Sequence, residues 1–197
     1  ANTSVMRAFI IPGLCLFLTM LSCAGSPAEI HPGAMHPEDY VPLIGEKHID
    51  LVANHSSLVG GSHLVDTLLN SGIRAGQIRA IFSPEHGFRG KQAAGEEVLD
   101  GRDPLTGIPV ISLYGNNRKP TPEQMEGIEL VLFDLQDVGV RFYTYISTLH
   151  YVMEACAEAA IPLVVLDRPN PNAGYVDGPV LEDSCRSFVG MHPIPVV

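Results

Sequence analysis

The sequence predicts an α/β fold built on a doubly wound, mainly parallel sheet. Short apolar runs alternate along the chain with segments of helical periodicity, a pattern typical of parallel sheets with crossover helices. The run at 130–135 (LVLFDL) is almost continuously apolar, as expected for a strand covered on both faces. Polar clusters follow the apolar runs directly, which indicates loops at one edge of such a sheet.

The composition is that of a globular protein. The chain has 197 residues, of which 46% are hydrophobic, and a formal net charge of −10. This length suits one domain plus a targeting segment. The acidic balance excludes nucleic acid as an expected partner, because no basic stripe is present to neutralise phosphates. An anionic ligand must therefore be held by a few local arginines.

The N-terminal segment predicts export. An apolar run at 8–22 follows Met6-Arg7, is interrupted by Pro12-Gly13, and is too short to span a bilayer comfortably, so residues 1–23 are interpreted as a signal peptide. Its end, Leu21-Ser22-Cys23, resembles a lipoprotein cleavage site with Cys23 as the lipidated residue; the alternative is a plain signal peptide with an incidental cysteine. We therefore expect a protein secreted across the inner membrane, a periplasmic or cell-envelope lipoprotein that contacts the membrane through its lipid anchor.

The remaining chain is predicted to comprise a linker over 24–40, rich in Pro, Gly, Ala and His, and one domain over 41–197. Five strands are expected, at 49–53, 78–82, 109–113, 130–135 and 163–166. Ser62 is a candidate N-cap for a helix that ends at Gly72, and Thr121-Pro122-Glu123-Gln124 predicts another helix start. A third helix is expected over 145–160. The sequence stops at 194–197 without completing an element, so we interpret the domain as truncated at its C-terminus.

Residues capable of catalysis or binding follow each predicted strand. In an open parallel sheet the carboxyl ends of the strands meet at one edge, so these residues are expected to converge on one crevice. A single polar residue at a strand end is often only a cap or turn residue, but five clusters together favour a functional site. The clusters are Asn54-His55-Ser56-Ser57, Glu85-His86 with Arg89, Tyr114 to Asn117, Asp134 to Tyr145, and Asp167 to Asn172.

The motifs that are missing narrow the chemistry. No G-x-G-x-x-G or P-loop pattern is present, so neither a nucleotide nor another cofactor is expected. The G-x-S-x-G motif of serine hydrolases is also absent, so a serine hydrolase is not expected. Carboxylates dominate instead, and two opposed carboxyls are what glycoside hydrolysis requires. With His55 and His86 they could also ligate a metal, but the histidines lack the usual ligand spacing, so no metal site is predicted.

Three long segments carry a family resemblance. SPEHGFRG (83–90), LVLFDLQDVGVRFYTYISTL (130–149) and VLDRPNPNAGYVDGP (165–179) closely resemble the NamZ family of exo-β-N-acetylmuramidases. The resemblance runs from about residue 49 to the end and implies the family's Rossmann-like N-terminal domain, with a smaller C-terminal domain outside this chain. It implies release of N-acetylmuramic acid from the non-reducing ends of peptidoglycan fragments. It also implies Glu85 as the general acid, with His86, Asp134 and Asp137 completing the catalytic site.

N-acetylmuramic acid carries a lactyl carboxylate, which a planar guanidinium binds well. Arg141 is the favoured partner, with Arg89 and Arg168 as further candidates; the alternative is an arginine paired structurally with Asp137 or Asp167. Further expected substrate contacts are Asn54, Tyr143 and Asn170. Two other functions stay open at this point: a metal-dependent hydrolase of another bond, and a lipoprotein that binds muropeptides without cleaving them.

Overall fold

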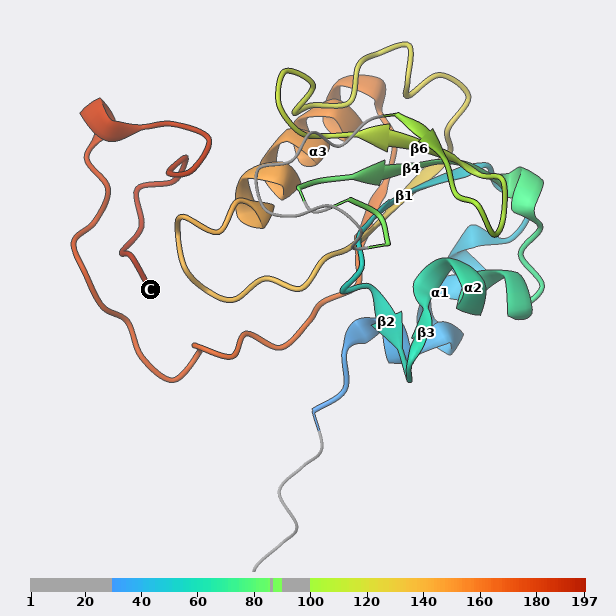
Figure 1. Cartoon of the computed structure of the whole chain (residues 1–197), viewed down its shortest axis with the longest axis horizontal. Coiled ribbons are helices and arrows are strands. Elements are labelled where there is room, and N and C mark those ends of the chain that lie inside the picture. Colours follow the sequence, from blue (N-terminus) through green and yellow to red (C-terminus); the bar gives the residue numbers. More distant parts are fainter. Residues whose placement is uncertain (1–29, 86, 90–99) are drawn as a thin grey trace, which may run out of the picture. The chain divides into compact units, whose positions relative to one another are not determined.

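The computed structural model describes residues 30–85, 87–89 and 100–197, and His31–Val197 form one compact unit. Within the described residues the main sheet has six strands in the order β5–β6–β4–β1–β7–β8 (Figure 1). All neighbours pair in parallel except β5, which is antiparallel to β6. The predicted mainly parallel α/β sheet is confirmed. In sheet order, the strands are Gly101–Arg102, Pro109–Ser112, Ile78–Ser83, Ile49–Ala53, Leu130–Asp134 and Leu163–Val165.

Helices cover both faces of the sheet, as the doubly wound prediction requires (Figure 1). α1 (Pro37–Ile44) and α2 (Leu64–Asn70) pack on the face to which β1 presents Ile49, Leu51 and Ala53. α3 (Tyr145–Ala159) packs on the other face, where Val52 lies. β7 contributes alternate residues to both layers, which explains why its sequence is continuously apolar.

The order of the strands places a topological switch point at the centre of the sheet. The chain passes from β1 outward through β4 to β6, and then returns to the other side of β1 to form β7 and β8. The connections that leave β1 and β7 therefore diverge at the carboxyl edge. In open α/β sheets, ligands bind at this divergence.

The second half of the predicted linker belongs to the folded domain. Residues Gly33–Met35 form a 3-10 helix and α1 follows directly. Ala34 and Tyr40 are buried in the core, and the Tyr40 hydroxyl donates to the Ala34 carbonyl over 2.9 Å. The prediction of a linker over 24–40 is thus wrong for this part, because proline and glycine here start and end short helices rather than keep the chain open. Residues 24–29, like Cys23 and the predicted signal peptide, lie outside the described residues.

Two predicted helix starts differ in the structure. α2 begins at Leu64, and its N-cap is His63, whose side chain accepts from the Val65 amide, rather than Ser62. Thr121 and Gln124 do form the predicted reciprocal capping bonds, but only turns follow. Gly127, at a φ of 74°, turns the chain into β7 before a helix can extend.

A two-stranded hairpin lies beside the carboxyl edge of the sheet. β2 (Leu58–Val59) and β3 (Ser62–His63) pair antiparallel around Gly60-Gly61, both at positive φ, as a tight hairpin turn requires. This hairpin was not predicted from the sequence. Among the described residues, no helix has the length and apolar character needed to cross a membrane.

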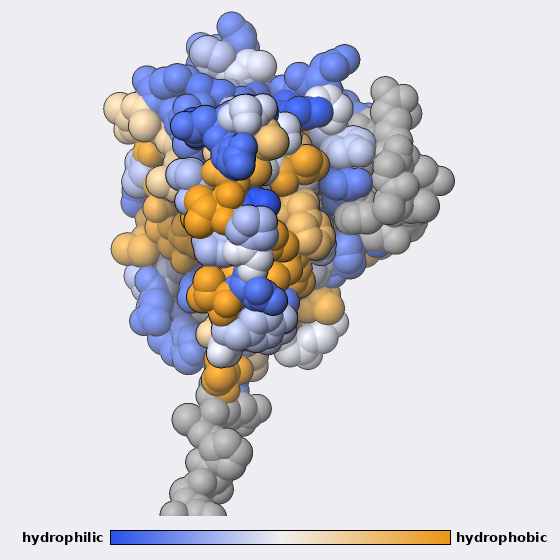
Figure 2. All heavy atoms as spheres, turned by 90° about the vertical axis from the view of Figure 1, so that its left-hand side faces the viewer, coloured by the Kyte–Doolittle hydropathy of each residue, from blue (hydrophilic) through white to orange (hydrophobic). Residues whose placement is uncertain are grey.

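After β8 the chain has little regular structure apart from a short 3-10 helix at Asp183–Cys185. This C-terminal segment, red in Figure 1, exposes apolar side chains, and Figure 2 shows apolar surface mixed with polar surface on the side where it lies. Its exposed apolar residues include Tyr175, Val176, Val180 and Val189. Cys185 in this segment is exposed, whereas Cys156 is buried on the inner face of α3, and both are free thiols.

Candidate active site

The switch point is occupied by Asn54, which follows β1, and by Asp134, which ends β7. Both side chains are fully buried. Ser57 connects the two residues through their main chains. Its hydroxyl accepts from the main-chain N–H of Asn54 and donates to the main-chain carbonyl of Asp134. The loop after β1 is therefore fastened to the end of β7, as expected for residues that share the carboxyl edge.

The Asn54 side chain also joins this loop to α3. Its Oδ1 accepts from the amide and the hydroxyl of Ser56, at 2.8 and 2.6 Å. Its Nδ2 donates over 2.6 Å to the hydroxyl of Tyr145, the first residue of α3. The His63 ring contacts the Asn54 carbonyl at 2.8 Å, and burial lowers the pKa of this histidine. Asn54 is thus an organising residue at the floor of the site.

Asp134 forms a buried ion pair with Arg168, which follows β8. The Arg168 Nε and Nη2 both donate to the Asp134 carboxylate, and Nη2 also donates over 3.0 Å to the Leu58 carbonyl of the hairpin. Burial raises the pKa of Asp134, while the hydrogen bonds and charge of Arg168 act in the opposite direction. Because each group neutralises the other below the surface, this geometry gives the pair a structural role.

Glu85 follows β4 and lines a small cavity of about 60 Å³ with the segment from Phe142 to Tyr145. The Tyr143 and Tyr145 rings meet edge to face, with centroids 4.8 Å apart. Tyr145 is buried, and burial raises the pKa of its phenol, with smaller contributions from Tyr143 and from the charge of Glu85. Glu85 is thus a half-buried carboxyl in a cavity that two tyrosines also line.

Asp137 lies at the side of a second cavity, of about 310 Å³, which Arg141 and Asn170 also line. The Asp137 Oδ2 accepts from the Gly139 amide over 2.7 Å, and burial raises the pKa of this carboxyl. Its Oδ1 is buried and has no hydrogen-bond partner in the part of the chain that the structure describes. The Arg141 Nη1 donates to the carbonyls of Pro179 and Ile194, so this arginine is not paired with Asp137.

The loop after β7 is held against the loop after β8. Gln136 donates to the carbonyls of Asp137 and Pro169, and Asn172 donates to the Val138 carbonyl. Gly139, at a φ of 72°, lies so close to the Asn170 side chain that a Cβ there would clash. These contacts bring two of the predicted polar clusters together.

Arg89 lies in a separate ion-pair cluster. Its guanidinium donates to the carboxylates of Asp103 and Asp66, at 2.7 to 3.2 Å. Burial tends to raise the pKa of Asp103, but the hydrogen bonds from Arg89 and Thr106 outweigh this and lower it to about 2. Neither acidic partner was predicted, since both are far from Arg89 in sequence. His86 lies outside the described residues.

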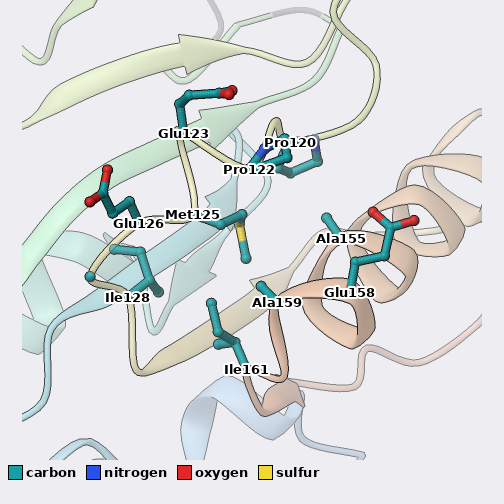
Figure 3. Close-up of a pocket in the computed structure, with 11 residues that line it drawn as sticks. Pro120, Pro122, Glu123, Met125, Glu126, Ile128, Ala155, Glu158, Ala159 and Ile161 are labelled. Carbon is teal, nitrogen blue, oxygen red and sulfur yellow. The ribbon is translucent and has the colours of Figure 1, made fainter.

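A cavity larger than these two lies away from this edge of the sheet. It measures about 560 Å³ and lies between the turns at 120–128 and the last turn of α3 (Figure 3). Ile128 and Ile161, which line it, precede β7 and β8, so the cavity is at the opposite, amino edge. Its floor is apolar, and the carboxylates of Glu123, Glu126 and Glu158 lie around it. Within residues 30–85, 87–89 and 100–197 no cluster of His, Cys, Asp and Glu is arranged to hold a metal ion.

Comparison with known proteins decides the family. A family model described as exo-β-N-acetylmuramidase NamZ, N-terminal, matches residues 49–197. The chain belongs to the NamZ family. The match begins at the first residue of β1 and includes all three segments on which the resemblance was predicted, so the NamZ assignment made from the sequence is confirmed.

Named and solved relatives agree with this assignment to the NamZ family. The chain is 42% identical over 199 residues to the peptidoglycan β-N-acetylmuramidase NamZ of Bacillus subtilis strain 168, with 94% of this chain and 47% of that protein covered. Two crystal structures of DUF1343 family proteins from Bacteroides fragilis NCTC 9343 match with TM-scores of 0.74 and 0.71, at 41% and 38% identity. They cover 86% and 81% of this chain and 43% and 40% of theirs. The chain thus spans about half the length of these relatives.

Proposed function

We propose that the protein is an exo-acting glycoside hydrolase that releases N-acetylmuramic acid from the non-reducing ends of peptidoglycan fragments. The observation that carries the proposal is the family match over 49–197, which includes the segment that places Glu85 in a cavity at the carboxyl edge. The 42% identical Bacillus subtilis relative, named as a peptidoglycan β-N-acetylmuramidase, supports the same reaction.

In this reaction Glu85 is the proposed general acid, which protonates the glycosidic oxygen as the bond to the departing sugar breaks. A second carboxyl is needed as base or nucleophile. Asp137 is the better candidate of the two that the sequence proposed, because its Oδ1 is unpartnered among the described residues and it lines a cavity. Asp134 is instead engaged by Arg168.

Of the three arginines considered for the lactyl carboxylate, Arg141 remains our candidate. Arg89 and Arg168 already form ion pairs with buried carboxylates. Arg141 donates only to main-chain carbonyls in the contacts described above, and it lines the same cavity as Asp137 and Asn170. A guanidinium held by neutral carbonyls keeps its charge available for an anionic ligand.

We further propose that the protein is a cell-envelope lipoprotein attached through Cys23. The support is the sequence pattern at 6–23 alone. Metabolic labelling with a tagged fatty acid tests it, with Cys23→Ser as the matched variant; label that persists in the variant, or no label in either protein, contradicts the proposal.

The activity test uses the complete product of the gene and a disaccharide of N-acetylmuramic acid and N-acetylglucosamine, whose sugar leaving group needs proton donation. Glu85→Gln is expected to lower kcat by about 10²- to 10⁴-fold, the usual contribution of a general acid. Glu126→Gln is the matched control, since this exposed glutamate lies at the opposite edge of the sheet, and it should behave as the wild type. Wild-type turnover in Glu85→Gln would remove Glu85 from the acid role.

Two further outcomes distinguish the alternatives. Activity that a chelator abolishes, together with bound metal by elemental analysis, would identify a metal-dependent hydrolase. Tight calorimetric binding of muropeptides without any product release would identify a binding protein.

A further inference from the structure

The hydroxyl of Tyr145 is held in one orientation by Asn54. The Ser56 main-chain N–H can only donate, so the Asn54 atom that faces it must be the amide oxygen. The amide nitrogen therefore faces Tyr145 and donates to its hydroxyl over 2.6 Å. The hydrogen-bond pattern thus assigns the orientation of the amide and with it the direction of the bond.

A phenol that accepts on one side still has its own proton to donate on another. The groups available to the Tyr145 hydroxyl are those of the 60 Å³ cavity: the hydroxyl of Tyr143, with which it forms a hydrogen-bond interaction, and the carboxyl of Glu85, which acts on it electrostatically. Tyr145 is buried in the apolar layer under α3, so its ring cannot turn away from the cavity without losing this packing.

We infer that Tyr145 is a positioning residue for Glu85. Oriented by Asn54, its buried phenol directs its proton toward Tyr143, in the wall of the cavity that Glu85 also lines, and so keeps this wall in the arrangement in which Glu85 faces the cavity. This inference rests on the proposed role of Glu85 as general acid. Tyr145 keeps its proton throughout the reaction, since burial raises the pKa of its phenol and keeps it a donor near neutral pH.

The test compares two substrates that need the acid to different extents. Cleavage of a disaccharide of N-acetylmuramic acid and N-acetylglucosamine expels a sugar alkoxide and depends strongly on proton donation, whereas an aryl muramide expels an acidic phenol and depends on it little. In the complete gene product, Tyr145→Phe should lower kcat on the disaccharide by about tenfold to a hundredfold and on the aryl substrate by less than about threefold. KM should stay within about twofold for both substrates, because a residue that acts through Glu85 changes the stability of the transition state rather than the binding of the substrate.

Tyr151→Phe is the matched control. Tyr151 lies on the same helix and its ring stacks on Phe188, so the variant removes a hydroxyl from α3 outside the cavity. It should match the wild type on both substrates.

A second variant keeps the tyrosine and changes only the direction of its hydrogen bond. Asn54→Asp places a carboxylate oxygen where the amide nitrogen donated, so the Tyr145 proton turns toward residue 54 and away from Tyr143. The same loss, selective for the disaccharide, is expected. This variant keeps the inference testable if Tyr145→Phe fails to fold.

Equal losses on both substrates, or no loss, would overturn the positioning role. The Glu85→Gln variant, measured in parallel, separates this failure from failure of the proposed function. If Glu85→Gln shows the disaccharide-selective loss and the Tyr145 and Asn54 variants do not, only the positioning role is wrong. If Glu85→Gln matches the wild type on the disaccharide, the acid role itself is wrong.

Discussion

Breaking the ion pair between Asp134 and Arg168 should strongly destabilise the domain. The Asp134 side chain is fully buried and that of Arg168 is 6% exposed, so Asp134→Asn leaves a guanidinium in a site without a counter-charge. Removing one partner of a buried pair typically costs about 3–5 kcal/mol. That is a large part of a domain's total stability of about 5–15 kcal/mol. For a domain of this size the thermal midpoint should fall by about 6–20 °C.

The measurement is urea unfolding followed by circular dichroism, for Asp134→Asn, Arg168→Met and a double variant, Asp134→Leu with Arg168→Met. The double variant should cost less than the two single changes added together, because no charge is then left buried alone. Single costs below about 1 kcal/mol, the range of exposed pairs, would refute the reasoning. So would a double variant whose cost equals the sum, since that result means the two groups are not coupled.

Two further perturbations test the sheet and its N-terminal attachment. Asp50 in β1 is fully buried and accepts from the Ala80 amide, and burial raises its pKa from 3.8 to about 7. The folded state therefore holds a proton that the unfolded state releases. The contribution of Asp50 to the free energy of unfolding is complete below about pH 4 and is lost as the pH rises to about 7. The difference between the pKa values of the folded and unfolded states corresponds to about 4 kcal/mol. Asp50→Asn should lack this fall in unfolding free energy between pH 5 and pH 8, and a pH dependence identical to that of the wild type would contradict the assignment. Gly33→Ala should cost about 1–3 kcal/mol, because its Cβ would lie 2.9 Å from the Asp167 main-chain nitrogen, whereas Gly76→Ala, with open space around it, should be nearly neutral in the same thermal unfolding assay.

The sequence predicted an element well where the hydrophobic pattern of one short segment is enough to indicate its burial. β1 and β7 lie at the centre of the sheet and contact apolar layers on both faces, so their sequences are hydrophobic apart from Asp50 in β1 and the final Asp134 of β7. Their positions were predicted almost to the residue. α1 was missed because its burial depends on Tyr40 and Ile44, two residues in a segment that is otherwise rich in proline and polar groups. No local pattern shows that this segment packs against the sheet.

The location of the candidate site at one edge of the sheet could be predicted, but which side chains pair with one another there could not. Parallel topology alone brings Asn54 and Asp134 together. The choice of partner for Asp134 depends on which strand lies beside β7, and from the sequence only Asp137 and Asp167 were expected as structural acids for an arginine. Arg168 reaches Asp134 because β8 neighbours β7 and is followed by a short loop. This pairing follows from strand order, which a single sequence does not specify.

The contacts that build the switch point also determine when it can form. Asn54 and Tyr145 are 91 positions apart, Ser57 and Asp134 are 77 apart, and Leu58 and Arg168 are 110 apart. Contacts of such long range form late in folding, since the chain loses the entropy of closing a long loop before the contact can stabilise it. A growing chain that ends before residue 168 has β1 and β4 but no completed floor of the site. The carboxyl edge is thus assembled last, after most of the domain has been synthesised.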